Sequence, residues 1–434
     1  MKKFLILFLV LLNVKLFAQV PEPVNDQTKP VLIYNAFIHI GDGNTIQNGF
    51  VSFDNGKITD VSSEDLNLES GTYNNFLKIN ANGSHLYPGL ILPNSKVGLE
   101  DISAVRATVD HTEVGELNSN IRSLIAFNTD SEVISTFRYN GILLSQVVPD
   151  GSFVTGNSSI MMMEGWNWED AAYKIDDGMH VKWPRKTYPP SRWSGQTSFR
   201  DNPNYKSSVD MINKFLIDSR SYFNLNGDEN KEVNLKLEAM VDVFNGKKKI
   251  YLHVGSREQI IESVQMFQKH GINDLVLVGA NDALYAIDFI LENDLPVLLN
   301  NLHRVPSRNH EDVDLPYKLP YLLQKEGVLV GLTASGSLHS QRNLPFLAGT
   351  AAGYGLGKEE ALKLITSNNA KILGIDNVTG TIMVGKDANI IISKGDILDM
   401  KSSVIEYAFI TGRKVNLDGK QQILYDRFKR KYSK

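Results

Sequence analysis

Imidazole, carboxylate and guanidinium groups follow three apolar segments in the second half of the chain. His253 ends the segment KIYLHV, a polar loop follows LPVLLNN, and the segment SLHSQRN follows GVLVGLTASG. The loop and the last segment carry His303, Arg304, Asp312, Asp314 and Arg342. Imidazole and carboxylate groups bind divalent metals, whereas guanidinium groups bind anions. The alternatives are a hydrogen-bonded structural histidine and a salt-bridged surface loop, so these residues are candidates for ligand binding.

These side chains can meet only if the segments before them are strands of one sheet. The middle of the chain alternates the apolar runs KIYLHVG, DLVLVGA, LPVLLNN and GVLVGLTASG with helical patterns. Ser256 and Gln259 form a capping-box pattern, and Ile260, Val264 and Phe267 follow with helical spacing. Apolar strands that alternate with helices indicate a parallel sheet. We expect an α/β fold with a (β/α)8 barrel, a doubly wound sheet being second, and chemistry where the strands end.

The two ends of the chain predict short strands and glycine turns instead. We expect residues 30–87 and 376–419 to form one composite β-sandwich beside a barrel of residues 88–375. The hydrophobic residues of 176–230 follow no clear helical or strand periodicity, and we expect an insertion or lid there, next to the site. The basic run at residues 420–434 predicts a solvated tail, with affinity for an anionic surface as the alternative.

Composition limits the function classes. The chain has 434 residues, of which 42% are hydrophobic and 22% charged, as in an ordinary soluble globular protein. Its net charge of −4 gives nucleic acid no general reason to bind. The absence of cysteine excludes disulfides and thiolate ligands. Residues 1–18 predict a signal peptide, followed by a leader over 19–29, so we expect a periplasmic or secreted protein without integral membrane association.

Three stretches resemble the amidohydrolase superfamily. YPGLILPNSKVG resembles its strand-1 signature, in which Pro-Gly and two apolar residues precede Asp and a His-x-His pair. NLPFLAGTAAGYGLGKEEALKLITSNNAKILGID and GTIMVGKDANIIIS resemble its C-terminal run, in the style of imidazolonepropionase-like members. The resemblance spans Pro30 to Gly419 and implies a barrel of the metal-dependent hydrolase type with a composite β-sandwich.

The resemblance also implies hydrolysis of C–N bonds other than peptide bonds in small, often cyclic amides, with one or two divalent ions. The implied ligands are the two histidines of strand 1, often a carboxylated lysine of strand 4, histidines of strands 5 and 6, and an aspartate of strand 8. Residue by residue, these positions fall on Asn94, Lys96, His253, Gly279 and about Ser335, and no lysine lies on a convincing strand 4. Only His253 is a usual ligand, so we expect no metal or other cofactor.

Two functions remain open. In the first, an exported protein with weak or no catalysis acts as a binding or partner subunit, for a small molecule, an active relative or a second copy. In the second, an active hydrolase holds zinc or another divalent ion through His253 and the loop from His303 to Asp314. We also predict that Lys96 replaces the metal charge and pairs with Asp312, Asp314 or the TASG turn, because an unpaired buried ammonium is costly. The alternative is a Lys96 side chain that extends outward to water.

Overall fold

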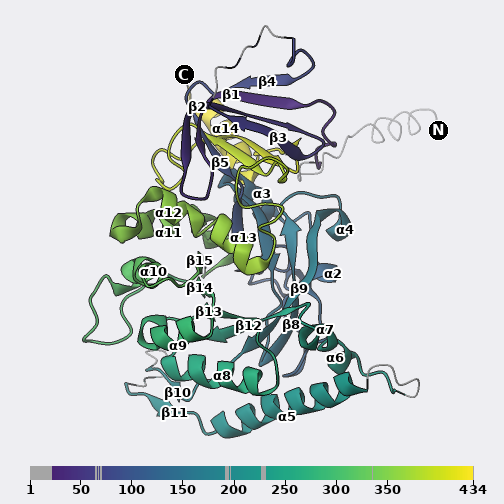
Figure 1. Ribbon diagram of the computed structural model, residues 1–434, viewed down its shortest axis with the longest axis vertical. Coiled ribbons are helices and arrows are strands. Elements are labelled where there is room, and N and C mark those ends of the chain that lie inside the picture. The colour runs from purple at the N-terminus through teal and green to yellow at the C-terminus, as the bar shows by residue number, and fades with distance from the viewer. Residues whose placement is uncertain are drawn as a thin grey trace, which may run out of the picture.

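The computed structural model describes residues 22–63, 66, 68, 71–190, 195, 197–225, 231–334 and 336–433. The predicted signal peptide and Ser335 lie outside these residues. Figure 1 shows two parts, with a sheet built from both ends of the chain above a barrel. In the described part of the chain, no helix is long and apolar enough to cross a membrane.

An eight-stranded sheet forms the barrel, in the order β15-β14-β13-β12-β9-β8-β7-β6. Its strands are β6 (Leu90–Ser95), β7 (Ile142–Val147), β8 (Val154–Met162), β9 (Ala172–Lys182), β12 (Lys249–Val254), β13 (Leu275–Gly279), β14 (Val297–Leu299) and β15 (Val330–Leu332). The fold is therefore the expected TIM-like barrel, with one correction. β8 runs antiparallel to both β7 and β9, while the other neighbours are parallel.

Helices surround the barrel strands as the sequence pattern predicts. α8 (Arg257–Lys269) starts with the capping box, in which the Ser256 side chain accepts from the backbone N–H of Gln259, and it buries Ile260, Val264 and Phe267. The other helices of this part are α2 (Ser123–Ala126), α3 (Glu132–Tyr139), α4 (Trp168–Ala171), α5 (Tyr205–Asn224), α6 (Leu235–Glu238), α7 (Val241–Phe244), α9 (Ile287–Glu292), α10 (Leu315–Lys325), α11 (Leu344–Ala351), α12 (Lys358–Lys363) and α13 (Ser367–Leu373).

The seam between β6 and β15 is closed by side chains rather than by a strand ladder. Asn369 on α13 donates its Nδ2 hydrogens to the carbonyls of Ile91 in β6 and Leu332 in β15, at 2.8 and 2.9 Å. The Thr333 hydroxyl donates to the carbonyl of Pro93 at 2.5 Å. Because buried carbonyls need partners, this fully buried asparagine joins the first and last barrel strands.

The upper sheet draws strands from both ends of the chain. Its members are β1 (Val31–His39), β2 (Thr45–Asp54), β3 (Lys57–Ser62), β4 (Leu77–Asn80), β5 (His85–Pro88), β16 (Ile390–Ser393), β17 (Ile405–Ile410) and β18 (Arg413–Lys414). β5 pairs antiparallel with β16, which joins the two ends. Backbone bonds between Ile58 and residues 385 and 386 fold the sheet back around its own core, which includes Phe53 and Phe409. Gly89 separates β5 from β6, so this composite domain leads straight into the barrel.

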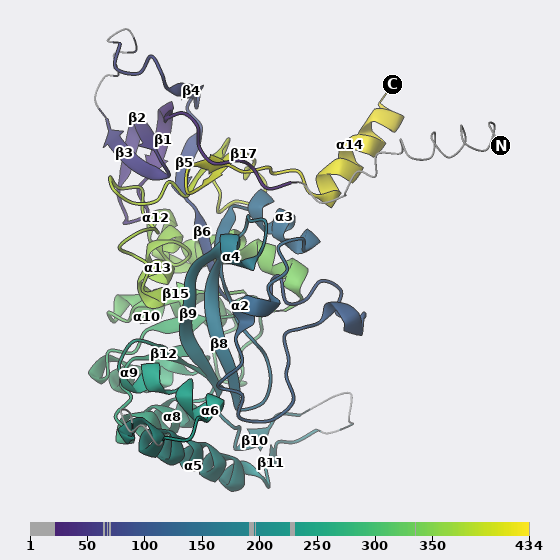
Figure 2. The same ribbon diagram turned by 90° about the vertical axis from the view of Figure 1, so that its right-hand side faces the viewer.

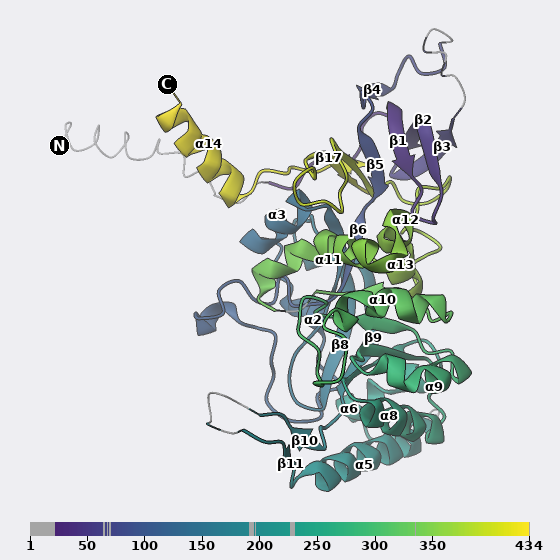
Figure 3. The same cartoon turned by 90° about the vertical axis from the view of Figure 1, so that its left-hand side faces the viewer.

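The expected insertion and the basic C-terminal run both contain regular structure. Residues 176–182 belong to barrel strand β9, and the expected insertion also holds the strands β10 (Thr187–Tyr188) and β11 (Arg200–Asp201) and the long helix α5. The expected solvated tail forms the helix α14 (Lys420–Tyr432), which stands away from the barrel in Figures 2 and 3. The sequence pattern of β9 was missed because polar residues interrupt it.

Replacing Asn369 with alanine should destabilise the barrel. The change leaves two buried strand carbonyls without a donor, so we expect the free energy of unfolding to fall by about 2–4 kcal/mol. Urea unfolding followed by circular dichroism measures this. Asn224→Ala, on the exposed last residue of α5, is the matched control and should be neutral. Equal stability of both variants would show that the seam does not depend on Asn369.

Candidate ligand-binding site

A pocket of about 340 Å³ lies at the carboxyl ends of four neighbouring barrel strands. β9 contributes Lys182, β12 contributes His253 and β13 contributes Gly279, while Asn300 follows β14. Arg185, Gln259 and Asn281 complete the polar part of the wall. The pocket therefore lies where a barrel collects its functional side chains.

Lys182 corrects the expectation that strand 4 lacks a lysine. In the barrel order, β9 is the fourth strand, and Lys182 is its last residue, paired in register with His253 of β12. Its ammonium forms an ion pair with Asp150, which follows β7, and it also donates to the carbonyl of Gly151 at 3.1 Å. The lysine is thus the side chain that links the pocket to the next group of charges.

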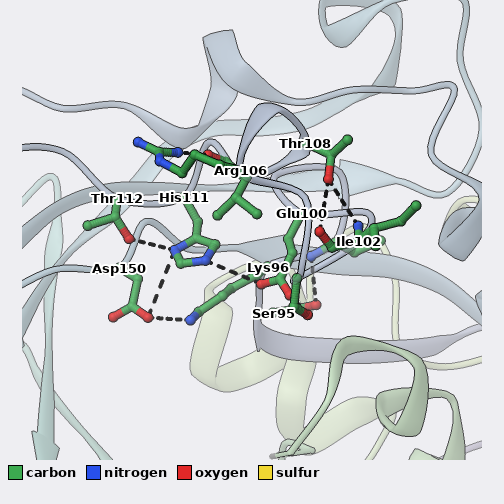
Figure 4. A network of polar contacts seen from close by, with 12 residues as sticks. Ser95, Lys96, Glu100, Ile102, Arg106, Thr108, His111, Thr112 and Asp150 are labelled. Atoms are coloured by element: carbon green, nitrogen blue, oxygen red, sulfur yellow. Dashed lines mark hydrogen bonds and ion pairs between the residues drawn. The ribbon is translucent and has the colours of Figure 1, made fainter.

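Asp150 joins lysines from two strands. One carboxylate oxygen accepts from Lys182 and the other from Lys96, whose Nζ atom reaches it from just beyond β6. Figure 4 shows Lys96 and His111 converging on Asp150. The prediction that Lys96 pairs with an acceptor from another strand end is confirmed, but the partner is Asp150. Asp314 pairs with Lys318 instead, at 2.8 Å.

The two lysines hold Asp150 in its charged form. Burial by itself would raise the pKa of this carboxyl, but the hydrogen bonds and charges of Lys182 and Lys96 outweigh burial and keep the pKa well below its ordinary value. Burial, and then the charge of Lys96, lower the pKa of His111. The His111 ring contacts Glu100 at 3.2 Å and the Thr112 hydroxyl at 2.7 Å. The positive charges of Lys96 and Lys182 are therefore balanced by the negative charges of Asp150 and Glu100.

His253 is connected to a buried chain of polar groups inside the barrel. Its Nε2 atom lies 2.9 Å from Nδ1 of His180, and Nε2 of His180 lies 2.9 Å from the hydroxyl oxygen of Ser158. Ser158 donates to Asp177 at 2.7 Å, and Tyr251 donates to the same carboxylate at 2.9 Å. All four partners are fully or almost fully buried. Buried polar groups require hydrogen-bond partners, and this series of hydrogen bonds supplies them.

The direction of these hydrogen bonds fixes the tautomer of His253. Because the Ser158 proton goes to Asp177, the Ser158 oxygen must accept from Nε2–H of His180, whose Nδ1 then accepts from Nε2–H of His253. Burial, and then the charge of Lys182, lower the pKa of His253 to about 3. His253 is therefore a neutral ring at neutral pH, and its Nδ1 has no hydrogen-bond partner among the described residues.

The strand-1 and strand-4 positions do not fit a divalent ion. Asn94 has a left-handed φ of 53° at a bulge of β6, and its backbone N–H donates to Gln146 at 3.1 Å. Lys96 brings a positive charge to the same strand end. A carboxylated lysine requires a neutral amine, whereas Lys182 forms an ion pair with Asp150. These positions therefore offer a metal no imidazole and no free anionic ligand.

The strand-6 position excludes a ligand side chain on steric grounds. Gly279 has a φ of 92°, and a Cβ atom there would lie 2.8 Å from the carbonyl oxygen of Val254. In the described part of the chain, no group of three or more His, Asp or Glu side chains could hold a metal. The donor set thus does not fit the metal that the fold implies, with the single Nδ1 of His253 as its nearest approach.

The loop after β14 forms surface contacts instead of joining His253. His303 contacts the Thr350 hydroxyl at 2.7 Å, and Arg308 makes two hydrogen bonds to the carboxylate of Asp282, at 2.9 and 2.6 Å. Arg304 bonds within the loop, to Val305 and Ser307. Asp312, Asp314 and Arg342 are not among the residues that line the pocket. The loop therefore matches the salt-bridged alternative for most of its residues.

Sequence reasoning missed Asp150, Lys182, His180 and Asp177. Asp150 directly follows the apolar run of β7, which is the same signal that singled out His253. Lys182 and the two buried polar residues lie on β9, in a region that we expected to be an insertion. Testing every residue at a strand end, including strands with polar interior residues, would have found the pair Asp150 and Lys182.

Replacing Asp150 with asparagine should lower stability at neutral pH. We expect a loss of about 1–2 kcal/mol, a modest value because Lys96 and Lys182 are each more than one third exposed and water screens them. The folded-state pKa of Asp150 is depressed, so its contribution is present above the unfolded pKa of about 4 and is lost as the pH falls further. Urea unfolding between neutral and acidic pH tests this.

The lysine variants give the control for this prediction. Lys96→Met leaves Lys182 on Asp150 and should cost less than Asp150→Asn, whereas Lys247→Met changes an exposed lysine and should be neutral. A gap between wild type and Asp150→Asn that stays constant as the pH falls below about 4 would contradict the ionic origin of the effect.

His253 should remain a neutral ring with its proton on Nε2. In ¹⁵N-histidine-labelled protein, we expect its two ring nitrogens to keep the shifts of this tautomer from about pH 8 to pH 5. Titration of His253 within this pH range would show that its burial and its hydrogen bond to His180 do not keep the ring neutral.

Three comparisons with known proteins add to this geometry. A family model described as the amidohydrolase family matches residues 318–418. The structure resembles an amidohydrolase from Thermotoga maritima MSB8, with a TM-score of 0.77 and 24% identity, covering 89% of this chain and 99% of that one. No match is found among curated proteins.

More distant structures share the fold alone. A zinc-bound adenosine deaminase from Xanthomonas campestris matches with a TM-score of 0.52 and 14% identity, over 95% of this chain and 99% of that one. A Xaa-Pro dipeptidase with methionine in its active site matches with 0.54 and 13%, over 89% and 100%. Together, the matched segment from α10 to the last strands and the shared barrel fold show that this chain resembles the amidohydrolase family in its C-terminal part and in its overall fold.

Proposed function

We propose that this protein binds a small molecule without a metal ion, at the pocket beside His253, and has weak or no hydrolase activity. One observation carries the proposal. The ion-paired group of Lys96, Asp150 and Lys182 occupies the strand ends whose residues would have to bind a metal. Both carboxylate oxygens of Asp150 accept from these ammonium groups, so Asp150 offers no free oxygen ligand to a divalent cation.

The ligand should carry an anionic group such as a carboxylate. The side chains that line the pocket include no aspartate or glutamate, and the guanidinium of Arg185 has no ion-pair partner among the described residues. The amides of Asn281 and Asn300 add donors to the same wall, and Gly255 precedes the N-terminus of α8, whose dipole favours negative charge. The dipeptidase neighbour holds methionine, which has a carboxylate, in its active site.

His253 would complete recognition from the other side. Its unprotonated Nδ1 is a hydrogen-bond acceptor, which suits an N–H group of the ligand. An amide or amino acid derivative combines such an N–H with a carboxylate. This ligand class agrees with the descent from hydrolases of small amides, and the apolar segment at residues 1–18 supports binding outside the cytoplasm.

The alternative is an active metal-dependent hydrolase that uses His253 and the loop from His303 to Asp314. His303 and Asp314 already contact Thr350 and Lys318, so that ligand set would require the loop to rearrange. The proposed binding protein and the alternative metallohydrolase differ in their metal content, which can be measured directly.

Elemental analysis and calorimetry together test the proposed function. After incubation with zinc and gel filtration, we expect less than one zinc ion per chain, because the donor set lacks the usual ligands. Titration with N-acetylated amino acids should give measurable binding that Arg185→Gln weakens, by about tenfold or more for loss of a charged hydrogen bond. Thermal shift measurements give an independent readout of the same binding.

Arg427→Gln, which removes an exposed arginine on α14, is the matched control and should bind like wild type. One stoichiometric zinc ion with zinc-dependent hydrolysis would favour the alternative function. Equal binding by wild type and Arg185→Gln would contradict the assigned ligand class without restoring the metal.

A further inference from the structure

The C-terminal helix α14 is attached to the body only at its beginning. Lys420 forms an ion pair with Glu132 of α3 at 2.9 Å, and Thr136 of the same helix contacts Gln421 at 3.4 Å. No residue of α14 is buried. In Figures 2 and 3 the helix extends away from both the barrel and the composite sheet. The first turn therefore fixes the helix while the rest of it faces solvent.

The exposed part of α14 carries an apolar stripe. At about 100° per residue, four large side chains fall within an arc of about 100°. They are 39%, 64%, 48% and 71% exposed, and they are Leu424, Tyr425, Phe428 and Tyr432. Gln421 lies in the same arc and contacts α3, so the stripe begins at the body and continues away from it. An exposed apolar stripe of this kind marks an interaction site rather than the surface of an isolated monomer in water.

Lysines border this stripe on both sides. By the same geometry, Lys431 lies about 20° beyond Leu424, and Lys429 lies about 40° beyond Tyr425. Their ammonium groups are 5.3 and 5.5 Å from the ring centres of Tyr432 and Tyr425. The lysine stems thus run along the apolar side chains with the charges at the border, which is the arrangement of side chains that snorkel at a membrane surface.

The charge of α14 differs in sign from that of the whole chain. Five of its thirteen residues are Lys or Arg and one is Asp, whereas the chain has a net charge of −4. A narrow apolar stripe with tyrosines and bordering lysines matches an anionic bilayer surface in both charge and hydrophobicity. With 13 residues the helix is too short to cross the apolar core of a bilayer, which takes about 20.

We propose that α14 docks this protein onto anionic phospholipid surfaces, lying in the plane of the headgroups with Leu424, Phe428 and the two tyrosines inserted. This proposal is independent of the function proposed for the barrel pocket. Because α14 is fixed to α3 by its first turn, docking also gives the barrel a defined orientation relative to the lipid.

Vesicle sedimentation tests the proposal. The chain from Gln19 onward is used, so that the apolar segment before it contributes no binding. We expect it to bind vesicles of phosphatidylcholine with one third phosphatidylglycerol, and to bind pure phosphatidylcholine at least about tenfold more weakly. High salt should release the bound protein, because it screens the lysines.

Variants of the helix identify the surface involved. Lys429→Glu with Lys431→Glu should weaken binding to anionic vesicles by about tenfold or more, and Phe428→Ser should weaken it at any salt concentration. The matched controls are Lys214→Glu with Lys247→Glu and Phe199→Ser, which change exposed residues of the barrel part. Thermal midpoints should stay unchanged, since α14 has no buried residue.

Two results would overturn the proposal. The first is equal binding to neutral and anionic vesicles, or equal loss in the helix and control variants. The second is a dimer in light scattering that Phe428→Ser dissociates, with no vesicle binding by wild type, since the stripe would then be covered by a second copy.

Discussion

A single carboxylate, Asp150, controls the charge balance at the mouth of the barrel. Its oxygens accept hydrogen bonds from Lys96, just beyond β6, and from Lys182, at the end of β9. Asp150 itself follows β7, so it connects the ends of three strands that are far apart in the sequence. Two ammonium groups this close would repel each other without a shared anion. The arrangement touches the pocket through Lys182, which lines it beside His253, and it touches His111, whose Nδ1 atom lies 4.0 Å from Asp150.

The second constraint is the polar interior of the barrel. Ser158, Asp177 and Tyr251 are buried among apolar strands, and each hydrogen bond in their chain points toward Asp177. Gly178 makes room for this chain, since a Cβ atom there would lie 2.3 Å from the ring of Tyr251, which stacks on His180. As a result, His253, which lines the pocket, has an unprotonated Nδ1 atom.

The sequence was sufficient for the fold class and for the strand ends that carry His253 and Lys96. Periodicity and the C-terminal motif predicted parallel strands and a composite sheet because these depend on local patterns of burial. The reversed β8 could not be predicted in the same way, because a strand buried on both faces has the same pattern in either direction. Lys182 was missed because polar residues interrupt the pattern of β9, where we expected an insertion, and without that strand Asp150 had no visible partner. Ser335 and the signal segment lie outside the described residues.

Gly279 also limits the routes by which this chain could change. Its left-handed backbone is closed against any Cβ atom by the carbonyl of Val254. A single nucleotide exchange can supply a side chain, but it cannot rotate the backbone of a barrel strand. Placing an imidazole at this strand end would first require a different backbone conformation in β13. Variants that keep the present backbone would be destabilised. A point mutation at Gly279 alone therefore does not place an imidazole at this strand end.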